Sequence, residues 1–242
     1  MTLNGKSILI TGGTSRLGRA FVERAVALGA SVSFTWHQGF DAAKTLEALG
    51  AKGWKLDLAD CRDIERFAKD FRAASDGLDA LIHNAAAVRD VLLRDMTEED
   101  WDYVLAVNLK APYYLTKKLL PLLFKKTPSK VLMITSRVGL QGGLGVSNYA
   151  AAKAGLIALA KSLARELGRK QVLVNAVNPG FMLSAMTDPI PEEYKQRNLT
   201  ESPLGRYSDA DEVADFLAYL CSDAMNQVTG QVLHWESRHT RM

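Results

Sequence analysis

Residues 10–19 read ITGGTSRLGR, a glycine-rich turn that joins a short apolar run to a helical pattern. Glycines and small hydroxyl residues let backbone N–H groups come close to a phosphate, and the positive end of the following helix dipole attracts it. A phosphate-binding turn here would be built from Gly12, Thr14, Ser15, Arg16 and Leu17. A tight turn without a ligand is the alternative, because such a motif alone is weak.

Short apolar runs alternate with helical patterns along the rest of the chain. Runs with the length of a strand buried on both faces occupy residues 7–10, 32–34, 80–82, 131–134 and 173–177. Apolar spacing near 3.6 marks residues 19–28, 61–73, 98–123, 149–167 and 209–220. This alternation predicts parallel strands with right-handed crossovers, so we expect an α/β fold: a Rossmann-type doubly wound parallel sheet with helices on both faces.

Length and composition favour one globular domain over residues 1–242. Apolar residues make up 48% and charged residues 24% of the chain, which is ordinary for a folded protein. The net charge of +3 is small and its cations are dispersed, so we expect no nucleic-acid partner. Only the proline-rich stretch near 180–203 breaks the rhythm, and we interpret it as a mobile substrate flap, with a linker as the alternative.

The chain shows no signal for export, membrane insertion or metal binding. Its N-terminus lacks a signal-peptide pattern, and no stretch reaches the roughly 18 apolar residues of a membrane span, so we expect a cytoplasmic protein with no membrane partner. Cys61 and Cys221 are expected to stay reduced in that compartment. The four histidines do not pair at ligand spacing, which predicts no metal site, and no Gly-x-Ser-x-Gly elbow is present.

The turn at Thr11-Gly12 with Gly18 resembles the T-G-x-x-x-G-x-G pattern of the short-chain dehydrogenase/reductase family, and the resemblance runs through the whole chain. Arg16 replaces the middle glycine of that pattern, as it does in pteridine reductases. Its guanidinium is expected either to contact a cofactor phosphate or to be solvated on the first turn of the helix.

A candidate catalytic group follows from the same resemblance. Tyr149 and Lys153 are spaced i, i+4 and share one helix face, while Ser136 follows a predicted strand at the same rim of the sheet. Negative charge grows on a carbonyl oxygen that receives hydride, so Tyr149 would donate a proton and Ser136 a hydrogen bond. The Lys153 ammonium is expected to lower the pKa of the phenol. The family's fourth member matches Asn108, which would hold a water leading from Lys153 to solvent; a helix kink is the alternative for Asn108.

Further cofactor contacts are implied by the resemblance. The second strand leads into Trp36-His37-Gln38 instead of the acidic residue of NAD-preferring enzymes, which favours NADPH, with His37 near its 2′-phosphate or simply on the surface. Asp57 and Leu58 match the family's adenine contact, with a helix cap as the alternative for Asp57. The remaining expected contacts are Asn84 and Ala85 at the centre of the sheet, Tyr149 and Lys153 themselves, and Pro179, Gly180, Met182 and Ser184 near the nicotinamide.

Residues 149–157 and 161–166 are very similar to the 3-oxoacyl-(acyl carrier protein) reductases of fatty acid synthesis, as are 88–93 and 202–206. This implies a ketone substrate carried as a 3-oxoacyl thioester on acyl carrier protein or coenzyme A. A basic patch of Lys125, Lys126, Arg169 and Lys170 would dock the carrier protein at the mouth of the site, or would simply be solvated.

Two other functions stay open. A pteridine or other small-ketone reductase is suggested by Arg16, although those enzymes commonly carry Asp where Ser136 stands. A non-catalytic nucleotide-binding scaffold is the alternative from another class. Relatives associate through the helix that contains Tyr149, so a homotetramer or homodimer is expected. The tail 235–242 departs from the family's ending, which lies near a subunit interface and the substrate cleft.

Overall fold

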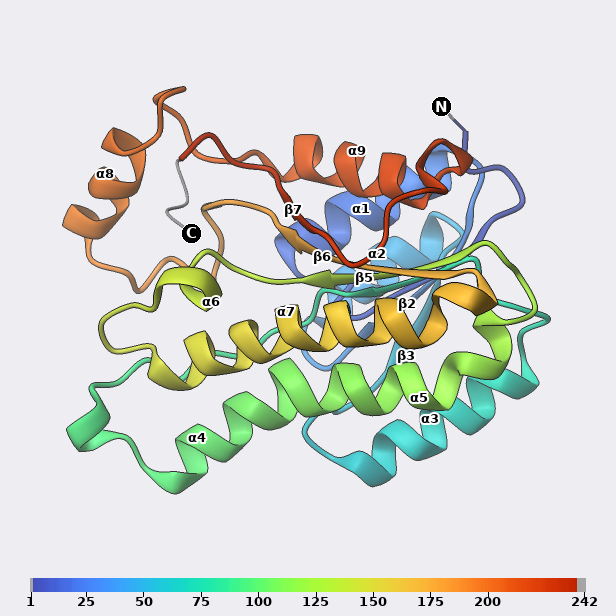
Figure 1. The fold of residues 1–242 in the computed structure, drawn as a ribbon, viewed down its shortest axis with the longest axis horizontal. Helices are drawn as coiled ribbons and strands as arrows, with labels where there is room; N and C mark the ends of the chain where they lie inside the picture. Colours follow the sequence, from blue (N-terminus) through green and yellow to red (C-terminus); the bar gives the residue numbers. More distant parts are fainter. Residues whose placement is uncertain (1, 239–242) are drawn as a thin grey trace.

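The computed structural model describes residues 2–238, in which seven parallel strands form one sheet of order β3-β2-β1-β4-β5-β6-β7 (Figure 1). The strands are β1 (Ser7–Ile10), β2 (Ser31–Trp36), β3 (Lys52–Lys55), β4 (Ala80–His83), β5 (Ser129–Ile134), β6 (Val172–Asn178) and β7 (Val232–His234). All pairings are parallel, so the predicted doubly wound sheet is confirmed. The last four residues of the unusual tail, 239–242, lie outside the described residues.

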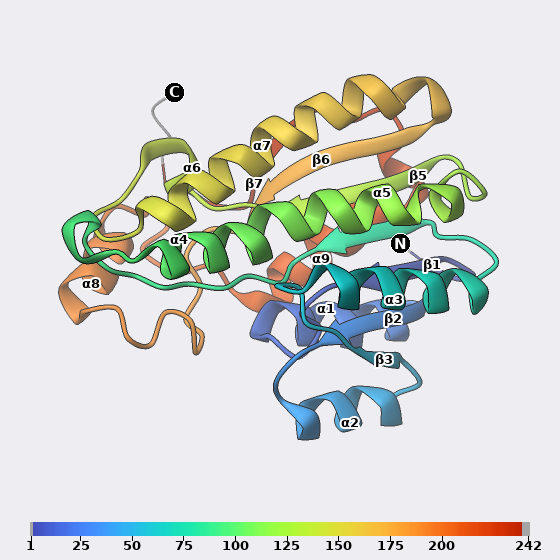
Figure 2. The same ribbon diagram turned by 90° about the horizontal axis from the view of Figure 1, so that it is seen from below.

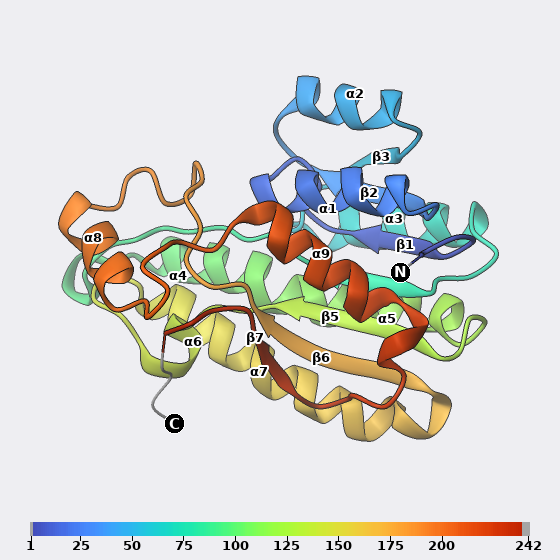
Figure 3. The ribbon, with the colours of Figure 1, turned by 90° about the horizontal axis from the view of Figure 1, so that it is seen from above.

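Helices cover both faces of the sheet, one apolar cluster under each layer (Figures 2 and 3). One layer holds α1 (Arg16–Ala27), α2 (Phe40–Ala48) and α9 (Ala210–Cys221). The other holds α3 (Cys61–Ala73), α5 (Ala111–Leu123) and α7 (Ser147–Leu167). Successive residues of a strand point to opposite faces of the sheet and so belong to different clusters. In β1, Ile8 and Ile10 belong to the cluster under α1, and Leu9 belongs to the cluster on the opposite face.

The predicted helix over 98–123 is interrupted. It consists of α4 (Glu98–Leu105), a π turn at Ala106–Lys110, and α5. Inside the π turn the side chain of Asn108 donates a hydrogen bond to the carbonyl of Val104 at 2.8 Å. Single π turns inside α-helices are frequent at functional sites.

The strand order places the site. β1 lies between β2 and β4, so the chain reverses direction across the sheet after β3 and leaves a crevice beyond the carboxyl ends of β1 and β4. Open α/β sheets bind ligands at such a switch point. Figure 1 shows the short helix α6 (Val138–Gln141) and α8 (Glu192–Thr200) beyond this same edge.

Several elements were not expected from the sequence. β3 is an edge strand with the sequence KGWK and no buried residue, so no apolar run announces it. α2 and α8 also lack a strong apolar stripe, and α8 forms inside the segment 180–203 without a single buried residue. No helix within residues 2–238 is long and apolar enough to cross a membrane.

Candidate active site

The glycine-rich turn leads from β1 into the amino end of α1. Ser15 caps the helix, accepting a hydrogen bond from the Gly18 amide at 3.2 Å. Among the described residues no protein acceptor takes the amides of Arg16 and Leu17, and no acidic side chain stands in the first turn. The exposed Arg16 adds a cation there. Free amides at the positive end of a helix dipole suit a phosphate, so this turn fits the pyrophosphate of a dinucleotide.

Close packing fixes the shape of the turn. A Cβ on Gly18 would lie 2.2 Å from the Gly12 carbonyl oxygen, and Gly12 itself has a φ of +68°. Asn84, at the end of β4, donates from Nδ2 to the Thr11 and Gly12 carbonyls at 3.0 and 3.1 Å and to Ser15 Oγ at 3.1 Å. The predicted residues Asn84 and Ala85 therefore lie against the turn, where a Cβ on Gly12 would be 2.9 Å from the Ala85 Cα.

The predicted adenosine contacts also meet at this edge. The His37 Nε2 is 3.9 Å from the Asp57 Oδ2, with both side chains about half exposed. Thr14 Oγ1 donates to the Gln38 carbonyl at 3.0 Å and fixes the chain after β2. Asp60, not Asp57, caps α3, so helix capping does not explain Asp57. Leu58 is partly buried beside it.

Ser136, Tyr149 and Lys153 converge beyond β5. Lys153 is only 2% exposed, and its Nζ donates to the Ile134 carbonyl at 2.8 Å. The same Nζ lies 5.4 Å from the centre of the Tyr149 ring. Tyr149 shares a side-chain hydrogen bond with Ser136. The three predicted side chains are thus brought together by the end of one strand and one face of α7.

The pKa values at this cluster are governed mainly by burial. Burial lowers the pKa of the Lys153 ammonium to about 7. Burial, with the negative charge of Asp90, raises the pKa of the Tyr149 phenol to about 12, and the hydrogen bond from Ser136 opposes the rise. In the free protein the pKa of Tyr149 is thus raised and not lowered, contrary to the expectation, because desolvation favours the neutral phenol. Tyr149 is protonated at neutral pH.

Asn108 faces the main chain that follows β4. Its Nδ2 donates to the Ala87 carbonyl at 2.7 Å as well as to Val104, and its Oδ1 accepts from the Ala87 amide at 3.3 Å. The side chain is fully buried. These bonds tie the π turn to the segment that leads from β4 toward Asp90.

Three contributors were not assigned a role from the sequence. Asp90 lies close enough to Tyr149 to affect its proton, and burial raises the pKa of the carboxyl. Buried His83 shares a 2.7 Å hydrogen bond with Thr116 Oγ1, and burial together with the charge on Lys153 lowers its pKa to about 3. Asn148 bonds Arg89 and Asp100 and orients the start of α7. Two of these residues could have been found from the sequence. Asp90 lies in the run 88–93 that is similar to the reductases, and His83 differs from the residue that the family usually has at its position.

The loop after β6 turns back toward the cluster. Gly180 follows Pro179 with a φ of +77°, and a Cβ there would collide with Ser208 Oγ. Thr187 Oγ1 accepts from the Ser184 amide at 2.8 Å and donates to the Met182 carbonyl at 3.0 Å. This loop and α6 border a cleft of about 1060 Å³ that includes Ser136 in its wall.

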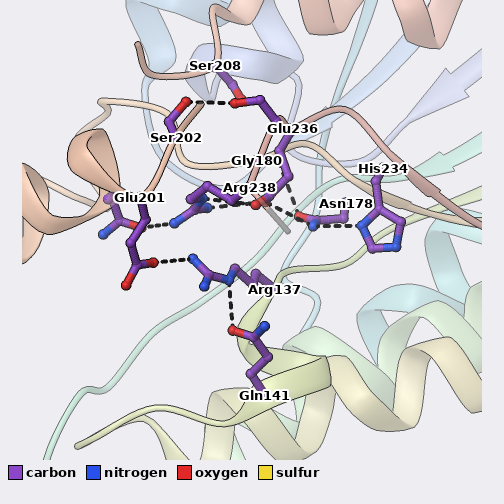
Figure 4. Close-up of polar contacts among 12 residues, drawn as sticks. Arg137, Gln141, Asn178, Gly180, Glu201, Ser202, Ser208, His234, Glu236 and Arg238 are labelled. Carbon is purple, nitrogen blue, oxygen red and sulfur yellow. Dashed lines mark hydrogen bonds and ion pairs between the residues drawn. The ribbon is translucent and has the colours of Figure 1, made fainter. Parts of the chain in front are cut away.

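Many of the side chains that line the cleft are apolar. They come from the chain after β4, from the turn before α7 and from the segment 180–203, and they include Val88, Val91, Leu92, Leu144, Val146, Phe181, Met186, Ile190 and Tyr194. Arginines also line the cleft and form hydrogen bonds with glutamates in one polar network (Figure 4). No cluster of three or more metal-ligating side chains occurs in residues 2–238.

The predicted basic patch is not at this cleft. Lys125 and Lys126 follow α5 and precede β5, and Arg169 and Lys170 precede β6. All four therefore lie at the amino edge of the parallel sheet, opposite Ser136. They cannot form the mouth of this chain's own cleft, and the sequence expectation is wrong in that respect.

Comparison with known proteins places this fold and cluster in a family. The family model described as Enoyl-(Acyl carrier protein) reductase matches residues 12–237. The chain belongs to the short-chain dehydrogenase/reductase family, as its motifs predicted. It is an oxidoreductase that acts on C=O and CH–OH groups.

Particular relatives agree with this assignment. The 3-oxoacyl-(acyl carrier protein) reductases FabG of Aquifex aeolicus (strain VF5) and Escherichia coli (strain K12) are 37% and 38% identical, covering 96% and 97% of both chains. The solved Pseudomonas aeruginosa RhlG/NADP active-site complex superposes with a TM-score of 0.90 at 27% identity, covering 98% of this chain and 96% of that one. A dehydrogenase/reductase from Sinorhizobium meliloti 1021 gives 0.87 at 29% identity, covering 96% and 94%.

Proposed function

We propose that this protein is an NADPH-dependent ketoreductase that converts a 3-oxoacyl thioester into the 3-hydroxyacyl product. The observation that carries the proposal is the meeting of Tyr149 and Lys153 with Ser136, which lines a largely apolar cleft. The similarity to 3-oxoacyl-(acyl carrier protein) reductases over nearly the whole chain supports the choice of substrate.

The choice of NADPH rests on the glycine-rich turn and on the residues that follow β2. Gly12, Thr14, Ser15, Arg16 and Leu17 would hold the pyrophosphate, and His37 with Arg16 would face the 2′-phosphate, since no carboxylate ends β2. Asn84, Ala85, Pro179, Gly180, Met182 and Ser184 would border the nicotinamide half. The dinucleotide, when bound, supplies the hydride. One solved structural neighbour is an NADP complex, which agrees with this choice.

The side chains of the cluster perform the proton chemistry. Tyr149 donates its phenolic proton to the carbonyl oxygen, for which its protonated state is the right one. Ser136 donates a hydrogen bond to the same oxygen and stabilises the charge that develops there. Lys153, in its ammonium form, stabilises the phenolate that remains. Asn108 orders the main chain at Ala87, and a water held near it would return the proton to Lys153.

A substrate panel tests the proposal. We expect NADPH oxidation with acetoacetyl-coenzyme A and acetoacetyl-(acyl carrier protein), and a much lower kcat/KM when NADH replaces NADPH. Crotonyl-coenzyme A is included because the matching family model is described as an enoyl reductase; a pterin covers the other candidate substrate class. Faster reduction of either of these than of acetoacetyl thioesters would replace the proposed substrate, and equal kcat/KM with both dinucleotides would refute the cofactor preference.

The pKa of Lys153 predicts a pH profile. Because burial lowers this pKa to about 7, the ammonium predominates below that pH and the neutral amine above it. We expect kcat/KM for ketone reduction to fall as pH rises through about 7, by up to about tenfold per unit, and alcohol oxidation to gain. Initial rates in both directions across this range check it. A reduction rate that stays level well into the alkaline range would show that the lysine's charge is not needed.

We also propose that the protein assembles as a homotetramer or homodimer. The outer surface of α5 carries the exposed Tyr113, and Leu140 and Leu144 are exposed beside the amino end of α7. Exposed apolar side chains next to a helix through which relatives associate support self-association.

A further inference from the structure

Arginine and glutamate side chains form a polar network (Figure 4), and Arg137, Arg197, Glu201 and Arg238 of this network line the cleft. Three guanidinium groups take part, those of Arg137, Arg197 and Arg238. Arg238 forms a buried ion pair with Glu236, whose partners are only 7% and 3% exposed, and it also donates to Asn198. Glu236 in turn accepts from Asn178 at 3.1 Å. Arg238 is therefore neutralised and fixed as part of the wall.

Arg137 and Arg197 share a single carboxylate. The Arg137 Nη1 donates to Glu201 Oε2 at 2.9 Å, and the Arg197 Nε donates to Glu201 Oε1 at 2.8 Å. The Arg137 Nε donates to Gln141 Oε1 at 2.7 Å, which leaves its Nη2 without a partner among the described residues. Two cations against one anion give this part of the cleft wall an excess positive charge.

The remaining charge in the cleft wall has the opposite sign and a different position. Asp90 lies on the side of Tyr149, whose proton it influences. An anionic group on a substrate would therefore be repelled from the Tyr149 side and attracted toward Arg137. The side chain of Arg137 is 22% exposed, so its charge is only partly screened by water.

We propose that Arg137 is a specificity-determining residue that binds a carboxylate carried by the ketone substrate. The proposal rests on the ketoreductase function above and adds the class of substrate: a ketone with an acid group a few bonds from the carbonyl. Glu201 accepts from Nη1 and Gln141 from Nε, so the Arg137 Nη2 is left to donate to a substrate carboxylate. The guanidinium fork suits such an anion because it can donate two parallel hydrogen bonds.

The position of Arg137 in the chain limits where the acid group lies. Arg137 directly follows Ser136, and consecutive Cα atoms are about 3.8 Å apart. Both residues line the same cleft, so we expect the guanidinium to be within about one arginine side chain of the carbonyl site, short of a phosphate at the far end of a thioester's carrier arm. The bound acid belongs to the acyl portion of the substrate, or to a small keto acid.

The test compares a keto acid with its methyl ester. Calorimetric titration of the protein in the presence of NADP⁺ with 4-oxopentanoate and with methyl 4-oxopentanoate measures the preference for the charged form. We expect the wild-type protein to bind the acid more tightly, and Arg137→Gln to reduce the acid-to-ester affinity ratio by about tenfold or more. Arg24→Gln, which removes an arginine that pairs with Asp215 between α1 and α9, controls for overall charge.

A second variant separates recognition from a structural tie. Glu201→Gln removes the internal counterion, so the affinity for the acid should rise, whereas loss of a purely structural link between α6 and α8 would lower it or leave it unchanged. An unchanged ratio in Arg137→Gln, or no measurable binding of the acid by the wild-type protein, overturns the proposal. Because binding is the readout, a protein that prefers the acid but reduces no ketone would refute the ketoreductase function alone.

Discussion

Replacing Tyr149 by phenylalanine is expected to lower kcat for ketone reduction by about 10²–10⁴-fold while NADPH affinity stays nearly unchanged. The phenol is the group that bonds Ser136, has Lys153 Nζ near its ring and carries a proton at neutral pH. Phenylalanine keeps the ring and its packing on α7 but cannot supply the proton. Steady-state rates of NADPH oxidation, together with fluorescence titration of NADPH, measure the two effects separately.

Tyr113→Phe is the matched control, because the phenol of Tyr113 is exposed on α5 and lies outside the cleft. It should leave both rate and affinity as they are. Turnover in the Tyr149 variant within a few fold of wild type would remove this residue from the chemistry. A parallel loss of NADPH binding would instead assign the defect to the cofactor site.

Gly18→Ala is expected to abolish measurable NADPH binding and to lower the Tm. In an open helix interior the same substitution would stabilise by about 1 kcal/mol. Here the new Cβ would lie 2.2 Å from the Gly12 carbonyl oxygen, so either α1 or the turn must move. Overpacking of this kind costs about 1–3 kcal/mol, and the movement displaces the amides of Arg16 and Leu17 that would hold the pyrophosphate.

Gly168→Ala provides the comparison, since a Cβ there meets nothing within 4 Å and the backbone already has a φ of −57°. Its Tm and its affinity for NADPH should match those of the wild type. Thermal unfolding and NADPH titration of both variants decide the matter: normal binding in Gly18→Ala would mean that the turn tolerates displacement and does not hold the dinucleotide.

Elements that bury a continuous apolar face could be predicted from the sequence. The strand at 7–10 and the helix at 61–73 were found at their observed bounds, because the strand buries apolar residues on both faces of the sheet and the helix buries one apolar stripe. The proximity of Ser136, Tyr149 and Lys153 could also be predicted. Parallel strands end at one edge of the sheet, and residues spaced by four share one face of a helix.

The remainder depends on tertiary context. β3 is held by pairing with β2 and not by its own apolarity, and α8 buries no side chain. The shifts in the pKa of Tyr149 and Lys153 depend on how deeply the folded chain encloses them, which no local pattern records. The same holds for the basic residues around 125 and 169: their composition suggested a docking patch, but the direction of the strands places them at the opposite edge.

The π turn at Ala106–Lys110 amounts to one surplus residue accommodated inside an otherwise continuous helix. Each residue advances an α-helix by about 100°, so removing the surplus would rotate everything downstream by that angle. Leu115, Leu119 and Leu122 would then swing away from the buried layer they now occupy. The π turn therefore sets the rotational phase of α5. A change that moved Asn108 out of this turn would also change how the whole of α5 packs.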